Sequence, residues 1–262
     1  TVFTDGTDKR LGAQLALNYT FDENNAIGIR YGYDKTPANT MNMILNTEVF
    51  QDHEPTESTY SPNLETDEDD THQLNAYYTG KINNWNVDLN LDGYWSDIHK
   101  ENNIDEVTRI PNQAEETRAV SSFNDVSNSL YATKLILSKP VWDGELALGG
   151  EYTYTNRGNL FINPEGILND DDSRIRENMG AIFAEYGKNF GKVQTQLGLR
   201  YEYTSSDYYV EGKRIDEQSK TYNNLFPTFS LSFPIQRINI QLAYRTDIAR
   251  PSYWDLRNNV LY

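Results

Sequence analysis

The chain has 262 residues, no cysteine and a formal net charge of −16 at neutral pH. Without cysteine it has neither disulfides nor thiolate metal ligands, and its negative charge argues against a nucleic-acid partner. No apolar run approaches the roughly eighteen residues of a transmembrane helix. The 19 tyrosines outnumber the 10 phenylalanines, an excess typical of rings that lie between hydrocarbon and water.

The first predicted strands alternate strictly between apolar and polar residues, a period of two that indicates β-structure with one apolar face. They cover Leu11–Phe21 and Ile27–Asp34 and are joined by a tight polar turn at Asp22–Asn25. A long acidic connection, Lys35–Asp70, comes next, and within it Met41–Phe50 could prolong a strand. The pattern therefore predicts a short turn followed by a long connection.

The clearest alternation lies between Trp85 and Trp95, after a predicted strand at His72–Ile82 and a tight turn at Asn83–Asn84. Apolar side chains occupy the odd positions of this strand, and polar side chains occupy most of the even positions. We therefore expect one face to meet lipid and the other to meet water. The lipid-facing set is Val87, Leu89 and Leu91, and the water-facing set is Asp88, Asn90 and Asp92.

Six further strands are predicted beyond a long polar connection at Asp97–Ser127. Phe183 leaves the register of the third of them ambiguous, because it interrupts the alternation. The six strands lie at Tyr131–Leu137, Leu146–Tyr154, Ile182–Phe190, Val193–Thr204, Phe229–Phe233 and Ile238–Arg245. They are joined by short turns at Pro140–Gly144, Gly191–Lys192 and Pro234–Arg237 and by long connections at Asn156–Arg176 and Ser205–Asn224.

Short and long connections thus alternate along the whole chain, which is typical of a membrane barrel with short periplasmic turns and long extracellular loops. The apolar stripes carry no charge in their middle, where a charge facing lipid would cost about 2–4 kcal/mol. Aromatic residues gather at both ends of the strands, as two membrane interfaces require. The predicted fold is all-β: an antiparallel, up-and-down transmembrane β-barrel segment of about ten strands.

No arrangement of residues points to catalysis, a cofactor or a metal. His53, His72 and His99 lie in or beside long connections and lack metal-ligand spacing. No nucleophile and base stand out together, and a glycine-rich phosphate loop is missing. The acidic runs are interpreted as solvated loop rather than as a calcium site. We therefore expect a protein that is not an enzyme.

Four short motifs in the last third of the sequence carry a family resemblance. They are Gly198–Thr204, Tyr222–Pro227, Ala243–Arg245 and Arg250–Leu256. In residue identity, order and spacing these motifs resemble those of the outer-membrane β-barrel family of TonB-dependent receptors common in Bacteroidetes. The resemblance is specific over Glu177–Leu256 and only architectural before that.

The resemblance implies a location in the bacterial outer membrane and a barrel of about 22 strands that is closed by a plug. It also implies uptake of a scarce nutrient, driven from the inner membrane. The implied partners are outer-membrane lipid, the plug domain of the same receptor, a TonB-type energising protein that acts through the plug, and an unidentified small nutrient. No nucleic acid is expected among them.

The ends of the chain suggest an incomplete barrel. Both ends are predicted on the long-loop side, and Thr1–Arg10 has no signal-peptide pattern. We therefore expect residues 1–262 to form one partial barrel domain from which the plug and the remaining strands are absent. Its first and last strands, Leu11–Phe21 and Ile238–Arg245, would then have unpaired edges.

Candidate binding residues fall into two groups. Arg200 and Glu202 are two residues apart on one strand, so both should point into the lumen, where they bind plug or substrate or brace the wall as an ion-pair ladder. The lumen-facing groups Glu151 and Arg245 have the same two interpretations. The loop candidates for ligand contact are Tyr60, Phe161, Asp170, Asp171 and Asp172. Proline at Arg250–Pro251 is expected to end the tenth strand.

Two other interpretations of the alternation remain open. The first is a soluble β-sandwich that acts as a surface adhesion or glycan-binding protein, because a sandwich also alternates polar and apolar residues. A barrel enzyme is the second. Dependence on detergent would distinguish the membrane barrel from the sandwich.

Overall fold

A computed structural model describes residues 2–248, in which strands make up nearly the whole chain. Among these residues no helix is both long and apolar enough to cross a membrane. The strands are β1 (Val2–Thr7), β2 (Leu11–Asp22), β3 (Asn25–Gln51), β4 (Glu54–Ile82), β5 (Trp85–Arg109), β6 (Glu116–Val141), β7 (Gly144–Ile162), β8 (Asp171–Phe190), β9 (Val193–Val210), β10 (Lys213–Arg214), β11 (Lys220–Ile235) and β12 (Ile238–Arg245). The motif Arg250–Leu256 and the strand end expected at Arg250–Pro251 lie outside the described residues.

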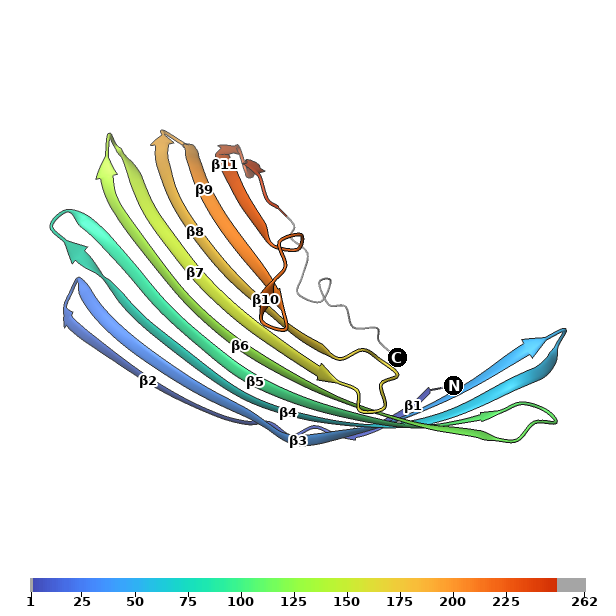
Figure 1. The fold of residues 1–262 in the computed structure, drawn as a ribbon. Coiled ribbons are helices and arrows are strands. Elements are labelled where there is room, and N and C mark those ends of the chain that lie inside the picture. The colour runs from blue at the N-terminus through green and yellow to red at the C-terminus, as the bar shows by residue number, and fades with distance from the viewer. Residues whose placement is uncertain (1, 249–262) are drawn as a thin grey trace.

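All these strands belong to one curved antiparallel sheet (Figure 1). Sequential neighbours pair from β3 to β9, and β11 and β12 follow, while β1 and β2 pair with different parts of β3. Within the described residues, β2 pairs only with β3 and β12 only with β11. Both edges are therefore open in this part of the chain. The soluble-sandwich interpretation is wrong, because a sandwich needs a second sheet and the described strands form a single one.

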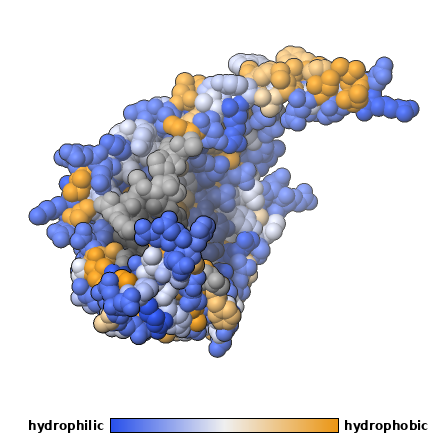
Figure 2. Space-filling view, turned by 90° about the vertical axis from the view of Figure 1, so that its right-hand side faces the viewer, coloured by the Kyte–Doolittle hydropathy of each residue, from blue (hydrophilic) through white to orange (hydrophobic). Residues whose placement is uncertain are grey.

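The pairing register brings the apolar stripes of successive strands onto one face of the sheet, which we call the outer face. The cross-strand partners that show this are Ile27–Tyr78, Tyr78–Leu89, Leu89–Leu135, Leu135–Gly150, Gly150–Ile182 and Ile182–Tyr201. Ile182 is 67% exposed on this face. Phe183 therefore lies on the opposite, inner face, which resolves the ambiguous register. In the space-filling view, hydrophobic residues are exposed on the surface, including on the projecting part of the sheet (Figure 2).

The register also places the two sets of residues from the Trp85–Trp95 segment on opposite faces. The odd-numbered set shares the outer face with Leu135 and Leu137, whereas the even-numbered set lies beside Lys134 and Ile136 on the inner face. Asp92 accepts a hydrogen bond from Asn75 Nδ2 at 2.7 Å, a contact between two inner-face groups. The parity expected from the sequence is confirmed.

The tight turns lie where the sequence predicts them. Asn83 and Gly191 adopt positive φ angles of 54° and 62° at two of them, and asparagine and glycine tolerate this left-handed backbone best. The turn between β6 and β7 places Trp142 and Asp143 at positive φ. Short turns at this end of the sheet set the register of each hairpin.

The long connections were expected to be loops, and for most of their length this is wrong. Figure 1 shows that the β3–β4 and β5–β6 hairpins continue far beyond the rest of the sheet. Strand β3 has 27 residues and β4 has 29, whereas about 9–11 residues cross a membrane. Only Asp52 and His53 separate these two strands, so the strand expected at Met41–Phe50 is confirmed. The sequence predicts this part of the strands poorly because water surrounds both faces. Neither face then needs apolar residues, and the alternation of apolar and polar residues disappears.

The connections outside strands are correspondingly short. They comprise residues 110–115 and 163–170 and the segments on either side of β10. Strand β1 was not predicted from the sequence. It pairs with residues Thr40 to Leu45 of β3, in the half of that strand that leads to the tip of the β3–β4 hairpin. A bulge between Thr36 and Asn39 shifts the β3–β4 register. Apolar residues beyond that bulge therefore change face relative to those before it.

Aromatic belts border the outer face at both ends. At the long-hairpin end, Trp95 Nε1 donates to Tyr131 Oη at 2.9 Å, and Tyr152 Oη donates to Asn178 Oδ1 at 2.8 Å. At the short-turn end, Lys139 Nζ lies 4.8 Å from the ring centroid of Trp85. Rings with a polar partner at each edge of an apolar band are the pattern that two membrane interfaces require.

Candidate functional site

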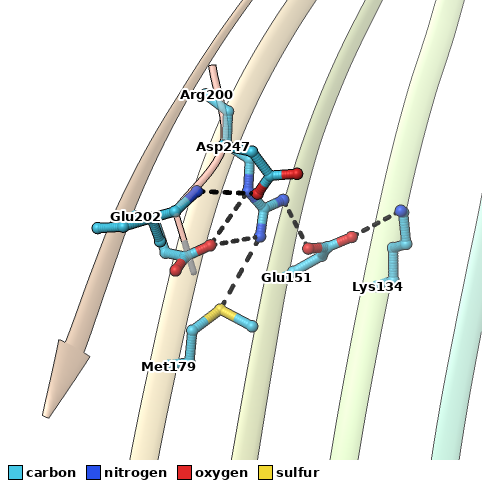
Figure 3. Close-up of polar contacts among 7 residues, drawn as sticks. Lys134, Glu151, Met179, Arg200, Glu202 and Asp247 are labelled. Atoms are coloured by element: carbon cyan, nitrogen blue, oxygen red, sulfur yellow. Dashed lines mark hydrogen bonds and ion pairs between the residues drawn. The ribbon is translucent and has the colours of Figure 1, made fainter. Parts of the chain in front are cut away.

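An ion-pair network crosses the inner face of β6 to β9 (Figure 3). Lys134 Nζ lies 2.6 Å from Glu151 Oε1, and Glu151 Oε2 lies 2.6 Å from Arg200 Nη1. Arg200 Nη2 in turn lies 3.1 Å from Glu202 Oε2 and 3.9 Å from Met179 Sδ. Arg200 therefore lies between two carboxylates that come from different strands.

The strand register explains how this network is built. Glu151 on β7 and Glu202 on β9 are both cross-strand partners of Ala181, which lies between them on β8. The methyl group of Ala181 is short, so the Arg200 side chain can extend across β8 to reach Glu151. A larger residue at position 181 would occupy the space that the guanidinium crosses.

The network is shielded from water more than an ordinary surface pair. The side chains of Glu151, Arg200 and Glu202 are 19%, 26% and 11% exposed. Exposed ion pairs contribute about 0–1 kcal/mol because water and salt screen them. Partial burial raises the strength of each contact and also the cost of removing one partner. The four charges sum to zero, so the network fixes side chains without creating a net field.

A depression of about 610 Å³ lies beside the network and combines charged groups with rings. Phe183 and Phe226 contribute the rings, and Lys134 Nζ lies 5.7 Å from the Phe183 centroid. A Cβ atom at Gly149 would lie 2.1 Å from Phe183 Cζ. Glycine at this position therefore lets the Phe183 ring lie against the wall. The depression can therefore bind a group or protein surface that is partly apolar and partly charged.

Arg200 and Glu202 are brought together as the sequence predicted, and Glu151 joins them. Arg245 lines the same depression but makes its own ion pair, with Asp247. Lys134 was not singled out from the sequence, although its even position in β6 already indicates the inner face. What the sequence could not show is the register that brings its ammonium group to Glu151.

The predicted loop candidates do not converge. Asp170 Oδ1 accepts a hydrogen bond from the Asn163 backbone N–H at 2.8 Å, so it orders the β7–β8 loop. Asp171 Oδ2 accepts one from Ser173 Oγ at 2.7 Å. Asp172 points to the opposite face from Asp171, because neighbours on a strand alternate. Within residues 2–248 no three acidic, histidine or cysteine side chains could hold a metal ion.

The two aromatic loop candidates are also separated. Phe161 pairs with Asp171 across the β7–β8 hairpin and lies on the inner face. Tyr60 lies near the tip of the β3–β4 hairpin, where its cross-strand partners are Asn46 on β3 and Val107 on β5. These residues therefore belong to different hairpins, and their role as ligand contacts stays a prediction.

His99 and Asp125 form a cross-strand ion pair on the long hairpins, beyond the aromatic belt. The hydrogen bond that the His99 ring donates to the Asp125 carboxylate raises the pKa of His99 above its ordinary value. A raised pKa means that the pair stabilises the β5–β6 hairpin below the ordinary histidine pKa and that this stabilisation is lost as pH rises through the raised value. We expect Asp125→Asn to shift the His99 titration to lower pH.

Histidine ring signals followed by NMR during a pH titration measure this change. His53 and His72 serve as internal controls, because neither contacts Asp125. A His99 titration that is identical in the parent protein and in Asp125→Asn would contradict the assignment.

Comparison with known proteins extends these observations. Residues 81–262 match the outer membrane protein β-barrel family. The structure resembles the open form of the ferric-catecholate import receptor Fiu from E. coli K12, with a TM-score of 0.52 and 11% identity over 93% of this chain and 53% of that receptor. The chain therefore spans about half of the length of this receptor. No curated protein matches it.

Two further structures show weaker similarity. The alcaligin outer membrane receptor FauA from Bordetella pertussis matches with a TM-score of 0.42 and 10% identity, over 93% of this chain and 42% of FauA. The outer membrane protease OmpT from Escherichia coli matches with a TM-score of 0.28 and 10% identity, over 88% of this chain and 96% of OmpT. Neither score is high enough to support an argument, so the fold rests on the family match and on Fiu.

Proposed function

Because the chain belongs to the outer membrane protein β-barrel family and therefore lies in the bacterial outer membrane, we propose that it forms the wall and extracellular hairpins of a TonB-dependent receptor that imports a scarce nutrient. Its outer face contacts membrane lipid. The short turns face the periplasm and the long hairpins face the cell exterior, as in other outer-membrane barrels.

The inner-face network and its depression are the observation that carries this proposal. Phe183 and Phe226 would be exposed to water in an open pore, at a cost in apolar hydration. A folded plug that fills the lumen would cover these rings and meet the fixed charges of Arg200 and Glu202. The combination of rings and neutralised charges therefore favours a plugged receptor over a water-filled channel.

The remaining partners follow from the same proposal. The plug domain of the same receptor would lie against this wall, and a TonB-type protein would act on the plug from the periplasm. The nutrient would be captured at the extracellular hairpins, where Tyr60, Phe161 and Asp172 are the first residues to test. The Bacteroidetes type of the receptor rests on the motifs Gly198–Thr204 and Tyr222–Pro227. The proposal assigns no catalytic residue.

Photo-crosslinking in intact cells tests the plug contact. A photoreactive amino acid at position 183 should crosslink the wall to a plug segment of the same receptor, identified by mass spectrometry. The same amino acid at position 182, the neighbouring residue on the outer face, should react with lipid instead. Crosslinks from position 183 to lipid, or no difference between the two positions, would contradict the proposal.

Uptake assays test the transport step. Strains with and without the gene should differ in the accumulation of at least one compound from a panel of labelled ferric siderophores, corrinoids and oligosaccharides. That difference should disappear when the TonB-type protein is deleted. Accumulation that persists without the energising protein would indicate a passive pore.

A further inference from the structure

A row of charged side chains crosses the outer face at the base of the long hairpins. Glu68 on β4, His99 on β5 and Asp125 on β6 are successive cross-strand partners. The His99 ring therefore has a carboxylate directly opposite it on each side, and it forms an ion pair with Asp125. The row lies about 13 Å beyond Trp95, the belt residue of the same strand.

This row lies where the sheet narrows. Strand β7 ends at Ile162, whose partner on β6 is Phe123, so the residues of β6 before Phe123 have no partner on β7. Strands β4, β5 and β6 remain paired beyond this point, and together with β3 they project from the rest of the sheet (Figure 1). Since Asp125 is close to Phe123 on the same strand, the row joins three strands at the line where the projecting hairpins begin.

The row lines a depression of about 450 Å³ in which carboxylates outnumber cations. Asp70 and Asp97 are cross-strand partners one step closer to the membrane, and like charges directly opposite each other destabilise strand pairing. The carboxylates around His99 are Glu68 and Asp70 on β4, Asp97 and Glu101 on β5, Asp125 on β6 and Asp172 on β8. Among the described residues, the permanent cations beside them are Lys35, whose Nζ lies 2.7 Å from Asp70 Oδ2, and Arg174 on β8. This part of the outer face therefore has an excess of negative charge.

His99 can change its charge near neutral pH, because an unperturbed imidazole has a pKa of about 6.5 and an unperturbed carboxyl group one of about 4. Its side chain is 48% exposed, so protons reach it from the external medium. The hydrogen bond to Asp125 raises the pKa of His99, and the charges of Glu68 and Glu101 add to this shift. Stabilisation by protonated His99 is therefore complete below the ordinary histidine pKa and is lost as pH rises through the raised value.

We propose that the row of Glu68, His99 and Asp125 is a pH-dependent switch that stiffens the base of the projecting hairpins when the external medium becomes acidic. Protonated His99 forms a favourable cross-strand pair on each side and offsets part of the negative charge around it. When His99 is neutral, backbone pairing holds the three strands at this line without those pairs, and the hairpins beyond it open more often. The switch needs neither plug nor nutrient, so it is independent of the proposed function.

Hydrogen exchange of the full protein in detergent, measured by mass spectrometry at about pH 5.5 and about pH 9, tests this switch. Parent and variant are compared at the same pH, so the intrinsic exchange rates cancel. At the lower pH, peptides from residues 100–122 should exchange about fivefold faster in His99→Gln than in the parent, since each cross-strand pair of opposite charges contributes about two- to threefold. At the higher pH the difference should fall below about twofold, because the imidazole of the parent is then neutral.

Further variants separate the charge of His99 from its shape. His99→Lys keeps a cation at both pH values, so its hairpins should be protected like those of the parent at the lower pH and should stay protected at the higher pH. Glu68→Gln removes one of the two pairs and should speed exchange about two- to threefold at the lower pH. His53→Gln is the matched control, because His53 lies at the tip of the β3–β4 hairpin, and it should exchange like the parent at both pH values.

Three results would overturn the proposal. They are parent-like exchange of folded His99→Gln at the lower pH, an equal effect of this substitution at both pH values, and a loss of protection in His99→Lys at the higher pH as large as that in the parent. Heat-modifiable mobility on a gel checks the folding of every variant. If His99→Gln does not assemble, parent-like exchange of Glu68→Gln at the lower pH would contradict the switch.

Discussion

Replacing Arg200 with alanine will lower the free energy of unfolding by about 2–3 kcal/mol, because Glu151 and Glu202 then lose the cation between them in a partly buried site. The two carboxylates flank Ala181, whose methyl group cannot replace the guanidinium, and only Glu151 keeps a second ion pair, with Lys134, among the ion pairs described above. Urea unfolding in lipid vesicles, followed by tryptophan fluorescence, measures the change.

Arg30 provides the control, since it is also an inner-face arginine and no ion pair of Arg30 occurs within residues 2–248. Arg30→Ala should change the free energy of unfolding by less than about 0.5 kcal/mol. Neutralising all three groups together, with Met at 200 and Gln at 151 and 202, should recover most of the loss. An Arg200→Ala variant as stable as Arg30→Ala would show that the network contributes nothing.

Arginine in place of Leu89 will destabilise the protein by about 2–4 kcal/mol, because it puts a charge on the lipid-facing side near the middle of the membrane. Leu89 lies between the two aromatic belts on β5, with the outer-face residues Tyr78 and Leu135 as its cross-strand partners. Urea unfolding in vesicles gives the free energy, and the yield of assembled protein in outer membranes gives an independent readout.

Thr79→Arg is the matched control. Thr79 is the next residue after Tyr78 on β4 and therefore faces the lumen, where Asp88 is its cross-strand partner. A charge on this side remains hydrated and gains an acidic neighbour, so we expect a change below about 1 kcal/mol. Equal losses in Leu89→Arg and Thr79→Arg would mean that the outer face does not meet lipid.

The strands that cross the membrane were predictable because lipid and water impose opposite demands on their two faces. A segment such as Trp85–Trp95 must alternate, and a single shift of register would expose Asp88 and Asp92 to lipid. Tight turns were predictable for an equally local reason, since Asn83 and Gly191 suit the backbone that a two-residue hairpin needs.

The extracellular hairpins were not predictable from the same signal. Between Lys35 and Asp70 water surrounds both faces of the hairpin, so both faces carry polar residues. The alternation of apolar and polar residues is then lost, and the sequence of this segment resembles that of a loop. Strand pairing nevertheless continues there, because it satisfies the backbone hydrogen bonds whatever the side chains are. Strand β1 was missed for the same reason, since its partner is this polar part of β3.

The sequence by itself determined the fold class, the face of every membrane strand except β8, and the shared face of Arg200 and Glu202, because each of these depends on the period of two within one strand. Only the tertiary structure decided that Glu151 joins Arg200 across Ala181, and that Asp171 and Asp172 point apart. These contacts depend on register between strands, and register is decided by turn geometry and bulges over the whole sheet. No single strand carries that information.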